Sequence, residues 1–255
     1  MIIEYHRPKS VPEALTLLSR NQPISYPLAG GTVINSGMEG AIAVVDLQAL
    51  GLGTITKKGN LMEAGAMVTL QALLDFPGLP EDVYTAIARE ATYNLRQMAT
   101  IGGTLVAASG RSPLITVLLA LNLNIELQKL DTKPEQVKIG NWLPLRNHSR
   151  PNTLITSVSF PLNVNLAYEY IARTPADQPI LCAAVVQWAS GRTRLTLGGW
   201  GVAPALAFDG PSPDGLEIAA QYACSMAEDQ WASAEYRREM AGVLSRRCLK
   251  RLSEA

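Results

Sequence analysis

Residues Ala99 to Ser109 read ATIGGTLVAAS, and the predicted elements of the chain are arranged around this stretch. An earlier stretch, Leu28 to Asn35, reads LAGGTVIN and repeats the Gly-Gly-Thr tripeptide. Two adjacent glycines expose backbone N–H groups, because no side chain covers them. Each stretch therefore predicts a turn that binds an anion, and the pair predicts a ligand whose diphosphate is held from two sides. A single Gly-Gly pair more often marks only a tight turn, so this prediction depends on the repetition.

The composition is that of an ordinary globular protein. The 255 residues are 47% hydrophobic and 17% charged, which is sufficient for a full core in two or three lobes. The 22 basic residues balance the 22 acidic residues, so no nucleic-acid or membrane-surface partner is indicated. The sequence shows neither a signal-peptide pattern nor an apolar run of spanning length, and we expect a cytoplasmic protein.

Metal ligands and catalytic nucleophiles are not indicated by the sequence. Cys182, Cys224 and Cys248 are far apart, and only His6 and His148 accompany them. Neither a CxxC pair nor an HxxxH pair occurs, so we expect no zinc or iron–sulfur cluster in this chain and interpret the cysteines as buried thiols. Neither histidine belongs to a recognisable triad, so each is interpreted as a surface or capping residue.

Two common phosphate-binding motifs, GxGxxG and GxxxxGK[ST], are absent, so the glycine turns belong to another architecture. A diphosphate would accept hydrogen bonds from N–H groups around the four glycines and from nearby hydroxyls. These residues are Gly30, Gly31, Gly102, Gly103, Thr32, Thr104 and Ser109. For the two threonines, local capping of the turn is an equally good interpretation.

The first half of the chain predicts strands and short helices around the glycine turns. A strand ends at Pro8, and a capping box of Ser10 and Glu13 begins the next helix. Residues 41–50 form an apolar run typical of a strand inside a sheet, and Thr69 caps a short helix. A further helix over residues 79–92 leads into the second glycine turn.

The second half predicts a buried helix followed by a small antiparallel sheet. Ser112 and Pro113 begin a helix that is apolar on every side. Residues 146–152 resemble a linker, and 153–161 form a strand. Three strand-length runs then follow, LAYEYIAR, PILCAAVVQWAS and RTRLTLGGWGVAPALA, before helices over 215–226 and 233–252.

Arg173 and Asp177 lie in the segment ARTPAD, at the end of a predicted strand. An arginine and an aspartate four residues apart usually form a local salt bridge. The same pair could also orient the ring edge of a cofactor, and the two roles are compatible.

The order of these motifs resembles the FAD-binding medium subunit of the molybdenum hydroxylases. That family includes the flavoprotein of carbon monoxide dehydrogenase and the flavin domain of xanthine dehydrogenase. The resemblance extends over nearly the whole chain, through YHRPKSVPEALTLL, LAGGT, VVDLQAL, LMEAGAMVTLQAL, ATIGGTLVAAS, SVSFP, LTLGGWGVAP and EYRREMAGVLSRR.

This resemblance implies an α+β fold with FAD lying between two domains. It implies an FAD-binding domain over 1–163, with lobes of about 1–52 and 53–163, followed by a C-terminal domain over 164–255 with a three-stranded antiparallel sheet and helices. It also implies that the two glycine stretches hold the diphosphate and ribityl chain, with Arg173 and Asp177 near the flavin. The expected cofactor-binding residues are Leu28, Ala29, Gly30, Gly31, Thr32, Val33, Ile34, Asn35, Ala99, Thr100, Ile101, Gly102, Gly103, Thr104, Ala108, Ser109, Arg173 and Asp177.

The function implied by the resemblance is electron transfer within an oxidoreductase complex. FAD would receive electrons from an iron–sulfur subunit, which takes them from a molybdenum-cofactor subunit, and would pass them to NAD, oxygen or another acceptor. Val33, Thr104 and Pro113 stand where the family usually has polar Asp, Asn and Asp. A flavin-free structural or assembly homologue is therefore the alternative. A stand-alone flavin oxidoreductase is a third possibility, but the sequence offers no acid or base for it.

Overall fold

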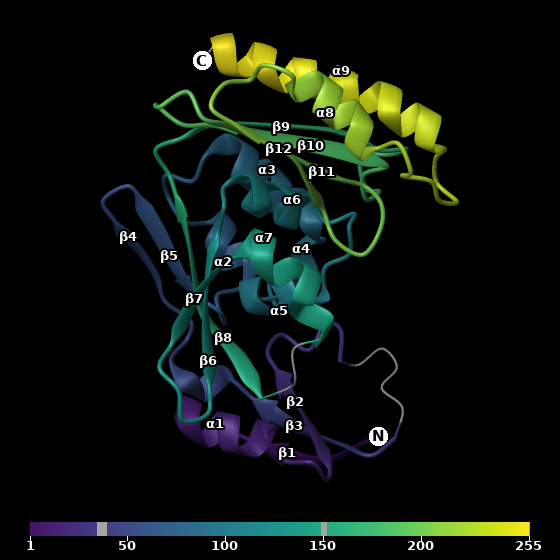
Figure 1. Ribbon diagram of the computed structural model, residues 1–255. Helices are drawn as coiled ribbons and strands as arrows, with labels where there is room; N and C mark the ends of the chain where they lie inside the picture. Colours follow the sequence, from purple (N-terminus) through teal and green to yellow (C-terminus); the bar gives the residue numbers. More distant parts are fainter. Residues whose placement is uncertain (35–39, 149–151, 255) are drawn as a thin grey trace. The chain divides into compact units, whose positions relative to one another are not determined.

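The computed structural model describes residues 1–34, 40–148 and 152–254, which fold into two compact units that alternate along the chain (Figure 1). Unit 1 comprises Met1–Phe76, Thr92–Ala107 and Asn124–Phe160. Unit 2 comprises Pro77–Ala91, Ala108–Leu123 and Pro161–Ala255. The sequence predicts two domains that meet once, between residues 163 and 164, whereas each of these units consists of three separate segments of the chain. The domain and lobe limits therefore stay a prediction.

Unit 1 begins with a small parallel sheet of order β1-β3-β2. Its strands are β1 (Ile2–His6), β2 (Ile24–Leu28) and β3 (Ile42–Asp46). The middle strand, β3, is buried at every position, as its apolar run predicts. Helix α1 (Val11–Leu18) packs Leu15 and Leu18 against Val45. One half of the predicted capping box is present, since Glu13 N donates to Ser10 Oγ at 3.4 Å, but the Glu13 carboxylate accepts from Lys9 N at 2.9 Å in place of Ser10 N.

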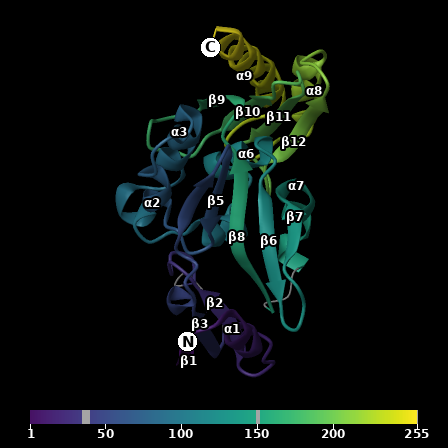
Figure 2. The ribbon, with the colours of Figure 1, turned by 90° about the vertical axis from the view of Figure 1, so that its left-hand side faces the viewer.

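A second sheet of unit 1 has the order β4-β5-β8-β6-β7, and Figure 2 shows β5, β8, β6 and β7 side by side. Its strands are β4 (Ile55–Lys58), β5 (Leu61–Gly65), β6 (Asn124–Lys129), β7 (Glu135–Lys138) and β8 (Thr153–Pro161). The long strand β8 supplies Leu154 to the core that α1 and β3 share. The two sheets of unit 1 are therefore joined by common apolar packing.

The remaining elements of unit 1 are short helices. They are η1 (Gln48–Leu50), α2 (Leu70–Leu74), α4 (Tyr93–Arg96), α5 (Ile101–Ala107), α7 (Ile139–Trp142) and η2 (Leu143–His148). Thr69 caps α2 as predicted, since Ala72 N donates to Thr69 Oγ1 at 3.1 Å. The predicted linker over 146–152 lies partly outside the described residues.

Unit 2 is built on an antiparallel sheet of order β12-β11-β10-β9. Its strands are β9 (Asn165–Ile171), β10 (Leu181–Gln187), β11 (Thr193–Gly198) and β12 (Ala205–Gly210). The expected α+β fold, with an antiparallel sheet and helices in the C-terminal part, is confirmed, but this sheet has four strands and not the predicted three. The run RTRLTLGGWGVAPALA contains β11 and the start of β12, because the chain reverses around Gly199 (φ 128°) and Gly201 (φ 70°).

Helices cover both faces of this sheet (Figure 1). They are α3 (Glu81–Glu90) and α6 (Pro113–Ala120) on one face, and α8 (Leu216–Ala223) and α9 (Ala234–Glu254) on the other. Alternate residues of β10 point to opposite faces of the sheet. On one face, Leu181, Ala183 and Val185 pack in the core with α8 and α9. Cys182 instead faces Thr116 of α6, at 3.5 Å.

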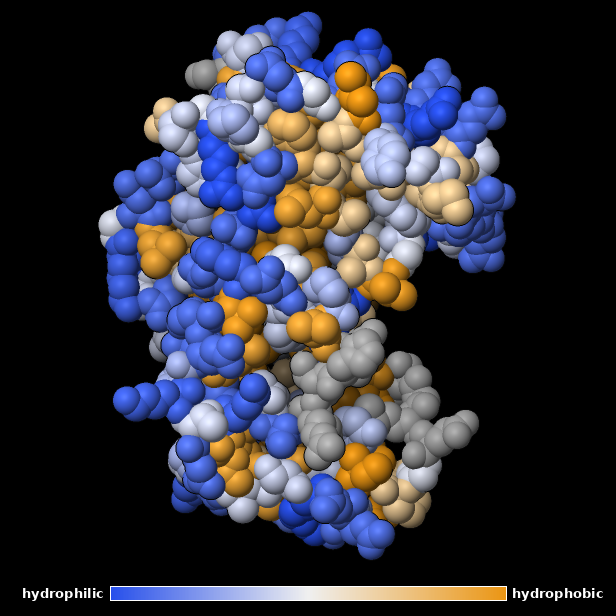
Figure 3. Space-filling model, in the orientation of Figure 1, coloured by the Kyte–Doolittle hydropathy of each residue, from blue (hydrophilic) through white to orange (hydrophobic). Residues whose placement is uncertain are grey.

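Helix α6 is buried along its whole length, as its uniform apolar sequence predicts. Its N-terminus is capped by Ser112, whose Oγ accepts from Ile115 N at 3.1 Å. On the outer surface the pattern is the opposite: hydrophilic residues predominate on the face shown in Figure 3, with apolar side chains between them. In the described part of the chain, no helix is both long and apolar enough to cross a bilayer.

Candidate functional site

The first glycine stretch is an open turn that follows β2 in unit 1. The end of β2 is fixed by parallel pairing with β3, where Leu47 N donates to Leu28 O at 3.0 Å. Gly31 has φ 69°, a left-handed conformation that glycine adopts without strain. Among the described residues, the amides of Gly30, Gly31 and Thr32 form no hydrogen bond. Within the described residues, this turn therefore presents three backbone donors without an acceptor, and their binding of an anion stays a prediction. Asn35, the last residue of the stretch, lies outside the described residues.

The first turn lies directly against the start of the second glycine stretch. A Cβ atom added to Gly30 would lie 1.8 Å from the carbonyl oxygen of Met98 and 3.1 Å from the amide nitrogen of Ala99. Only glycine permits such an approach, because any side chain would collide with this backbone. The structure thus brings together, within one unit, two stretches that are about 70 residues apart in sequence.

The second glycine stretch is a helix and not the expected open turn. Gly102 and Gly103 lie in the first turn of α5 (Ile101–Ala107), and their amides already have acceptors. Gly102 N donates to Ala66 O at 3.0 Å, and Gly103 N donates to Thr100 Oγ1 at 3.1 Å. The prediction that these two amides are free to bind a diphosphate is therefore wrong for this structure.

Close packing explains why glycine occurs in this helix. A Cβ on Gly102 would lie 2.9 Å from both Cβ and O of Ala66. The segment after β5 runs alongside the second stretch, with Ile101 N donating to Val68 O at 2.9 Å and Leu70 N to Ala99 O at 2.8 Å. Glycine at position 102 therefore allows two backbone segments to pack closely. The sequence analysis interpreted the same glycine as part of an anion-binding turn.

The hydroxyls of the two stretches have different surroundings. Thr32 is exposed and Thr104 is half-buried, and neither hydroxyl has a hydrogen bond among the described residues. Thr100 is buried and caps α5 through its bond with Gly103 N. The unbonded amides of the first turn together with these two free hydroxyls suit the phosphates of a dinucleotide. The residues present in unit 1 therefore fit a bound FAD.

The remaining predicted site residues belong to unit 2. Ala108 and Ser109 follow α5, and Ser109 Oγ accepts from Arg111 N at 3.2 Å. Arg173 and Asp177 are exposed, but the expected salt bridge between them does not form. Instead, the Arg173 guanidinium lies 5.0 Å from the ring centre of Trp231, and Asp177 O accepts from Arg89 at 3.3 Å.

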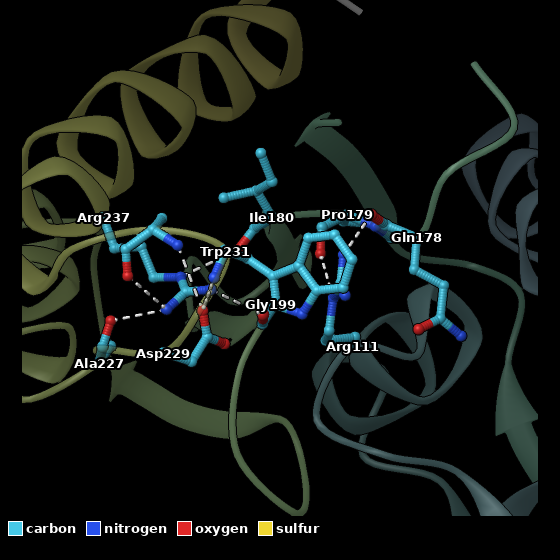
Figure 4. Close-up of polar contacts among 10 residues, drawn as sticks. Arg111, Gln178, Pro179, Ile180, Gly199, Ala227, Asp229, Trp231 and Arg237 are labelled. Atoms are coloured by element: carbon cyan, nitrogen blue, oxygen red, sulfur yellow. Dashed lines mark hydrogen bonds and ion pairs between the residues drawn. The ribbon is translucent and has the colours of Figure 1, made fainter. Parts of the chain in front are cut away.

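Arg111 and Trp231 are the residues at this place that sequence reasoning missed (Figure 4). The Arg111 guanidinium lies 4.4 Å from the Trp231 ring centre and donates to Pro179 O at 3.0 Å and Gln178 O at 2.8 Å. Burial lowers the pKa of Arg111, as do Arg237 and Arg173 nearby, while Asp229 and Asp177 oppose this. The sequence carries no signal for this cluster, since its members lie in three distant segments.

A buried arginine supports the loop that carries Trp231. Arg237 is 0% exposed and donates to the carbonyl oxygens of Ile180, Ala227 and Gly199, at 2.8 to 3.2 Å. It also donates to Asp229 Oδ1 at 2.8 Å, and Trp231 N donates to the same oxygen at 2.8 Å. Burial acts to raise the pKa of Asp229, but the hydrogen bonds from Arg237 and Trp231 lower it overall.

Pro113, where the family resemblance implies an acidic residue, begins α6 beside the carboxylate of Glu90. Glu90 of α3 accepts from Ser112 Oγ at 2.7 Å and from Leu114 N at 3.0 Å, so it binds the start of α6. Burial raises the pKa of this carboxyl, although both hydrogen bonds lower it. Glu90 thus supplies a carboxylate at the N-terminus of α6.

The three cysteines are buried thiols, as expected. Burial raises the pKa of Cys182 to about 11 and that of Cys224 to about 12, so neither forms a thiolate near neutral pH. Within residues 1–34, 40–148 and 152–254, no group of three or more His, Cys, Asp or Glu side chains is arranged to hold a metal ion.

Comparison with known proteins identifies the class. The family described as the FAD binding domain in molybdopterin dehydrogenase matches residues 1–163. The carbon monoxide dehydrogenase medium chain of Afipia carboxidovorans is 30% identical, over 97% of this chain and 96% of the relative. The nicotine 6-hydroxylase medium subunit of Paenarthrobacter nicotinovorans is 29% identical, over 72% of this chain and 68% of the relative.

A solved structure agrees with these relatives. The reconstituted CO dehydrogenase from Oligotropha carboxidovorans contains a chain that matches with a TM-score of 0.84 and 26% identity, covering 99% of this chain and 98% of that one. The protein belongs to the FAD-binding subunits of the molybdenum hydroxylase family. It is an oxidoreductase subunit, and FAD is its cofactor. The flavin-free alternative is thereby disfavoured.

Proposed function

We propose that this subunit transfers electrons through FAD, from an iron–sulfur subunit to an external acceptor such as NAD or oxygen. When bound, FAD supplies the redox chemistry, so the chain itself has to bind and orient it. The absence of a recognised nucleophile in the sequence agrees with that division of labour. The relatives are medium chains or subunits, which supports a complex with iron–sulfur and molybdenum-cofactor subunits.

The observation that carries the proposal is the open turn over Leu28–Ile34. The amides of Gly30, Gly31 and Thr32 and the Thr32 hydroxyl, none of which has a hydrogen bond to another described residue, are donors for phosphate oxygens. From the second stretch, the half-buried Thr104 hydroxyl adds a further donor. The proposal also assigns FAD contacts to Ala108, Ser109, Arg173 and Asp177 of unit 2, and a guanidinium such as that of Arg173 suits a polar ring edge.

The binding part of the proposal is tested with Gly30→Ala in the full chain. The new Cβ collides with the backbone at Met98, so the turn has to move and FAD affinity should fall roughly 100-fold. Affinity is measured by titrating apoprotein with FAD and following flavin fluorescence. Gly53→Ala is the matched control, because nothing lies within 4 Å of its Cβ position and its backbone is not left-handed. Equal affinity in both variants would contradict the assigned site.

The electron-transfer part is tested on the complex purified through a tag on the full chain. FAD, iron and molybdenum should be recovered in a constant ratio. Flavin absorbance of the reduced complex should then return to the oxidised form on addition of the acceptor, NAD or oxygen. Recovery of the chain with FAD but without associated iron would contradict the proposed donor. Reduced flavin that neither acceptor reoxidises would contradict the proposed acceptors.

A further inference from the structure

The loop that carries Arg173 has an unusual means of support. Arg173 is exposed, and within the described residues it forms no ion pair or hydrogen bond. It instead contacts the face of Trp231, 5.0 Å from the ring centre. An exposed arginine without a fixed partner samples many rotamers, and an aromatic face is one of the few groups that restrict a guanidinium without neutralising it.

Trp231 is itself held in place from two sides (Figure 4). On the backbone side, its amide donates to Asp229, which the fully buried Arg237 binds. On the ring side, Arg111 lies over the same indole at 4.4 Å. Two cations on one ring repel each other, but Arg111 is also held by the carbonyl oxygens of Gln178 and Pro179, at 2.8 and 3.0 Å. The ring is therefore a fixed platform within unit 2.

Arg111 connects this platform to two predicted cofactor segments. Its amide donates to Ser109 Oγ at 3.2 Å, and its guanidinium donates to the carbonyl oxygens of Gln178 and Pro179, immediately after Asp177. Ser109 and the 173–177 loop are far apart in sequence, yet both adjoin this one residue. The cluster thus links two segments that belong to the same proposed site.

We propose that Trp231 is a positioning residue for Arg173, with Arg111 as the second support of the same loop. The inference rests on the proposed function, which places Arg173 near the flavin. Trp231 need not touch the cofactor: its role is to keep the Arg173 guanidinium in one orientation and leave its N–H edge free for a polar acceptor.

The test is a double-mutant cycle on the full chain, with FAD affinity of the apoprotein as the readout. Trp231→Leu should weaken FAD binding about tenfold, since a cation–π contact restricts Arg173 only weakly compared with direct bonds. Trp231→Phe keeps an aromatic face and should weaken it only about threefold. Arg173→Gln should weaken binding at least as much as Trp231→Leu, and the double variant should bind like Arg173→Gln alone.

A matched control is available in the same unit. Trp188 also has an arginine on its face, Arg192 at 5.2 Å, but it lies at the β10–β11 turn. Trp188→Leu should therefore leave FAD affinity unchanged. Thermal unfolding and the visible circular dichroism of bound flavin accompany each titration. Trp231→Leu should alter the flavin signal while its melting temperature stays close to that of Trp188→Leu.

The outcomes separate this inference from the proposed function. Normal FAD binding in Trp231→Leu, or additive losses in the double variant, would overturn the positioning role and leave the function intact. Wild-type apoprotein that fails to bind FAD would overturn both. Loss of binding that Trp231→Phe does not rescue, together with a lower melting temperature, would assign Trp231 a purely structural role and also overturn the inference.

Discussion

The two Gly-Gly-Thr segments of unit 1 share a tripeptide but have opposite roles in the structure. In the first, Gly30 and Gly31 form an open turn whose amides are unbonded among the described residues. In the second, Gly102 and Gly103 begin a helix and their amides are bonded within the chain. Because glycine has no side chain, the backbone donors of the first segment are exposed, and the backbone of the second segment packs closely against its neighbour. The same local sequence does not define a phosphate site until its neighbours are known.

Among substitutions that test this difference between the two segments, we expect the largest loss of stability at Gly102, in the closely packed second segment. Gly102→Ala places a Cβ 2.9 Å from Ala66, so backbone atoms must shift, and we expect a loss of about 1–3 kcal/mol in unfolding free energy. Denaturant unfolding of the FAD-free chain measures this, with Gly53→Ala as the control. A variant that unfolds like wild type but loses FAD would show that Gly102 serves the ligand and would remove the contrast.

A smaller and more specific effect separates the two threonine hydroxyls. Thr100→Val removes the cap on Gly103 N and should lower stability by about 1 kcal/mol. Thr32→Val removes an exposed hydroxyl that bonds to no other described residue, and should leave stability within about 0.5 kcal/mol of wild type. FAD affinity should respond in the opposite order, falling about tenfold in Thr32→Val. Paired unfolding and titration experiments check both halves, and equal behaviour of the two variants would break the comparison.

The smallest effect concerns Val33, which is 55% exposed in the first turn. Val33→Asp introduces the acidic residue that the family resemblance implies at this position, and we expect FAD to bind about threefold more tightly because the carboxylate accepts a hydrogen bond from a hydroxyl of the ribityl chain. Val33→Ile changes size without polarity and should leave the affinity unchanged. The same titration measures both. Weaker binding in Val33→Asp would indicate that the turn accepts only an apolar side chain at this position.

Local signals in the sequence predicted local structure well. The caps at Ser10, Thr69 and Ser112 all form, because each depends only on residues three positions further along the chain. The buried helix α6 and the buried strand β3 follow from uniform apolar runs. The thiols are buried for two local reasons: Cys182 lies in the apolar run of β10, whereas Cys224 and Cys248 face the core of unit 2 from their helical segments.

The sequence failed where distant segments decide the outcome. At the start of α5, Ile101 N donates to Val68 O and Gly102 N donates to Ala66 O. The Gly-Gly-Thr tripeptide alone does not predict these acceptors, because they belong to a segment more than 30 residues earlier in the chain. Similarly, Arg173 contacts Trp231 and not the nearby Asp177. The split of one predicted strand into β11 and β12 depends on left-handed glycines that resemble ordinary strand residues in the sequence.

The alternation of the two units along the chain constrains any fragment of this protein. A truncated chain ending at the family boundary, residue 163, would contain α3 and α6 but lack the β9–β12 sheet against which they pack. The face of α6 that the sheet buries would then lose its apolar cover, and such a surface promotes aggregation. Neither unit can be inherited or exchanged as one continuous gene segment, so nearly the whole chain must be synthesised before unit 2 has its full complement of packing partners.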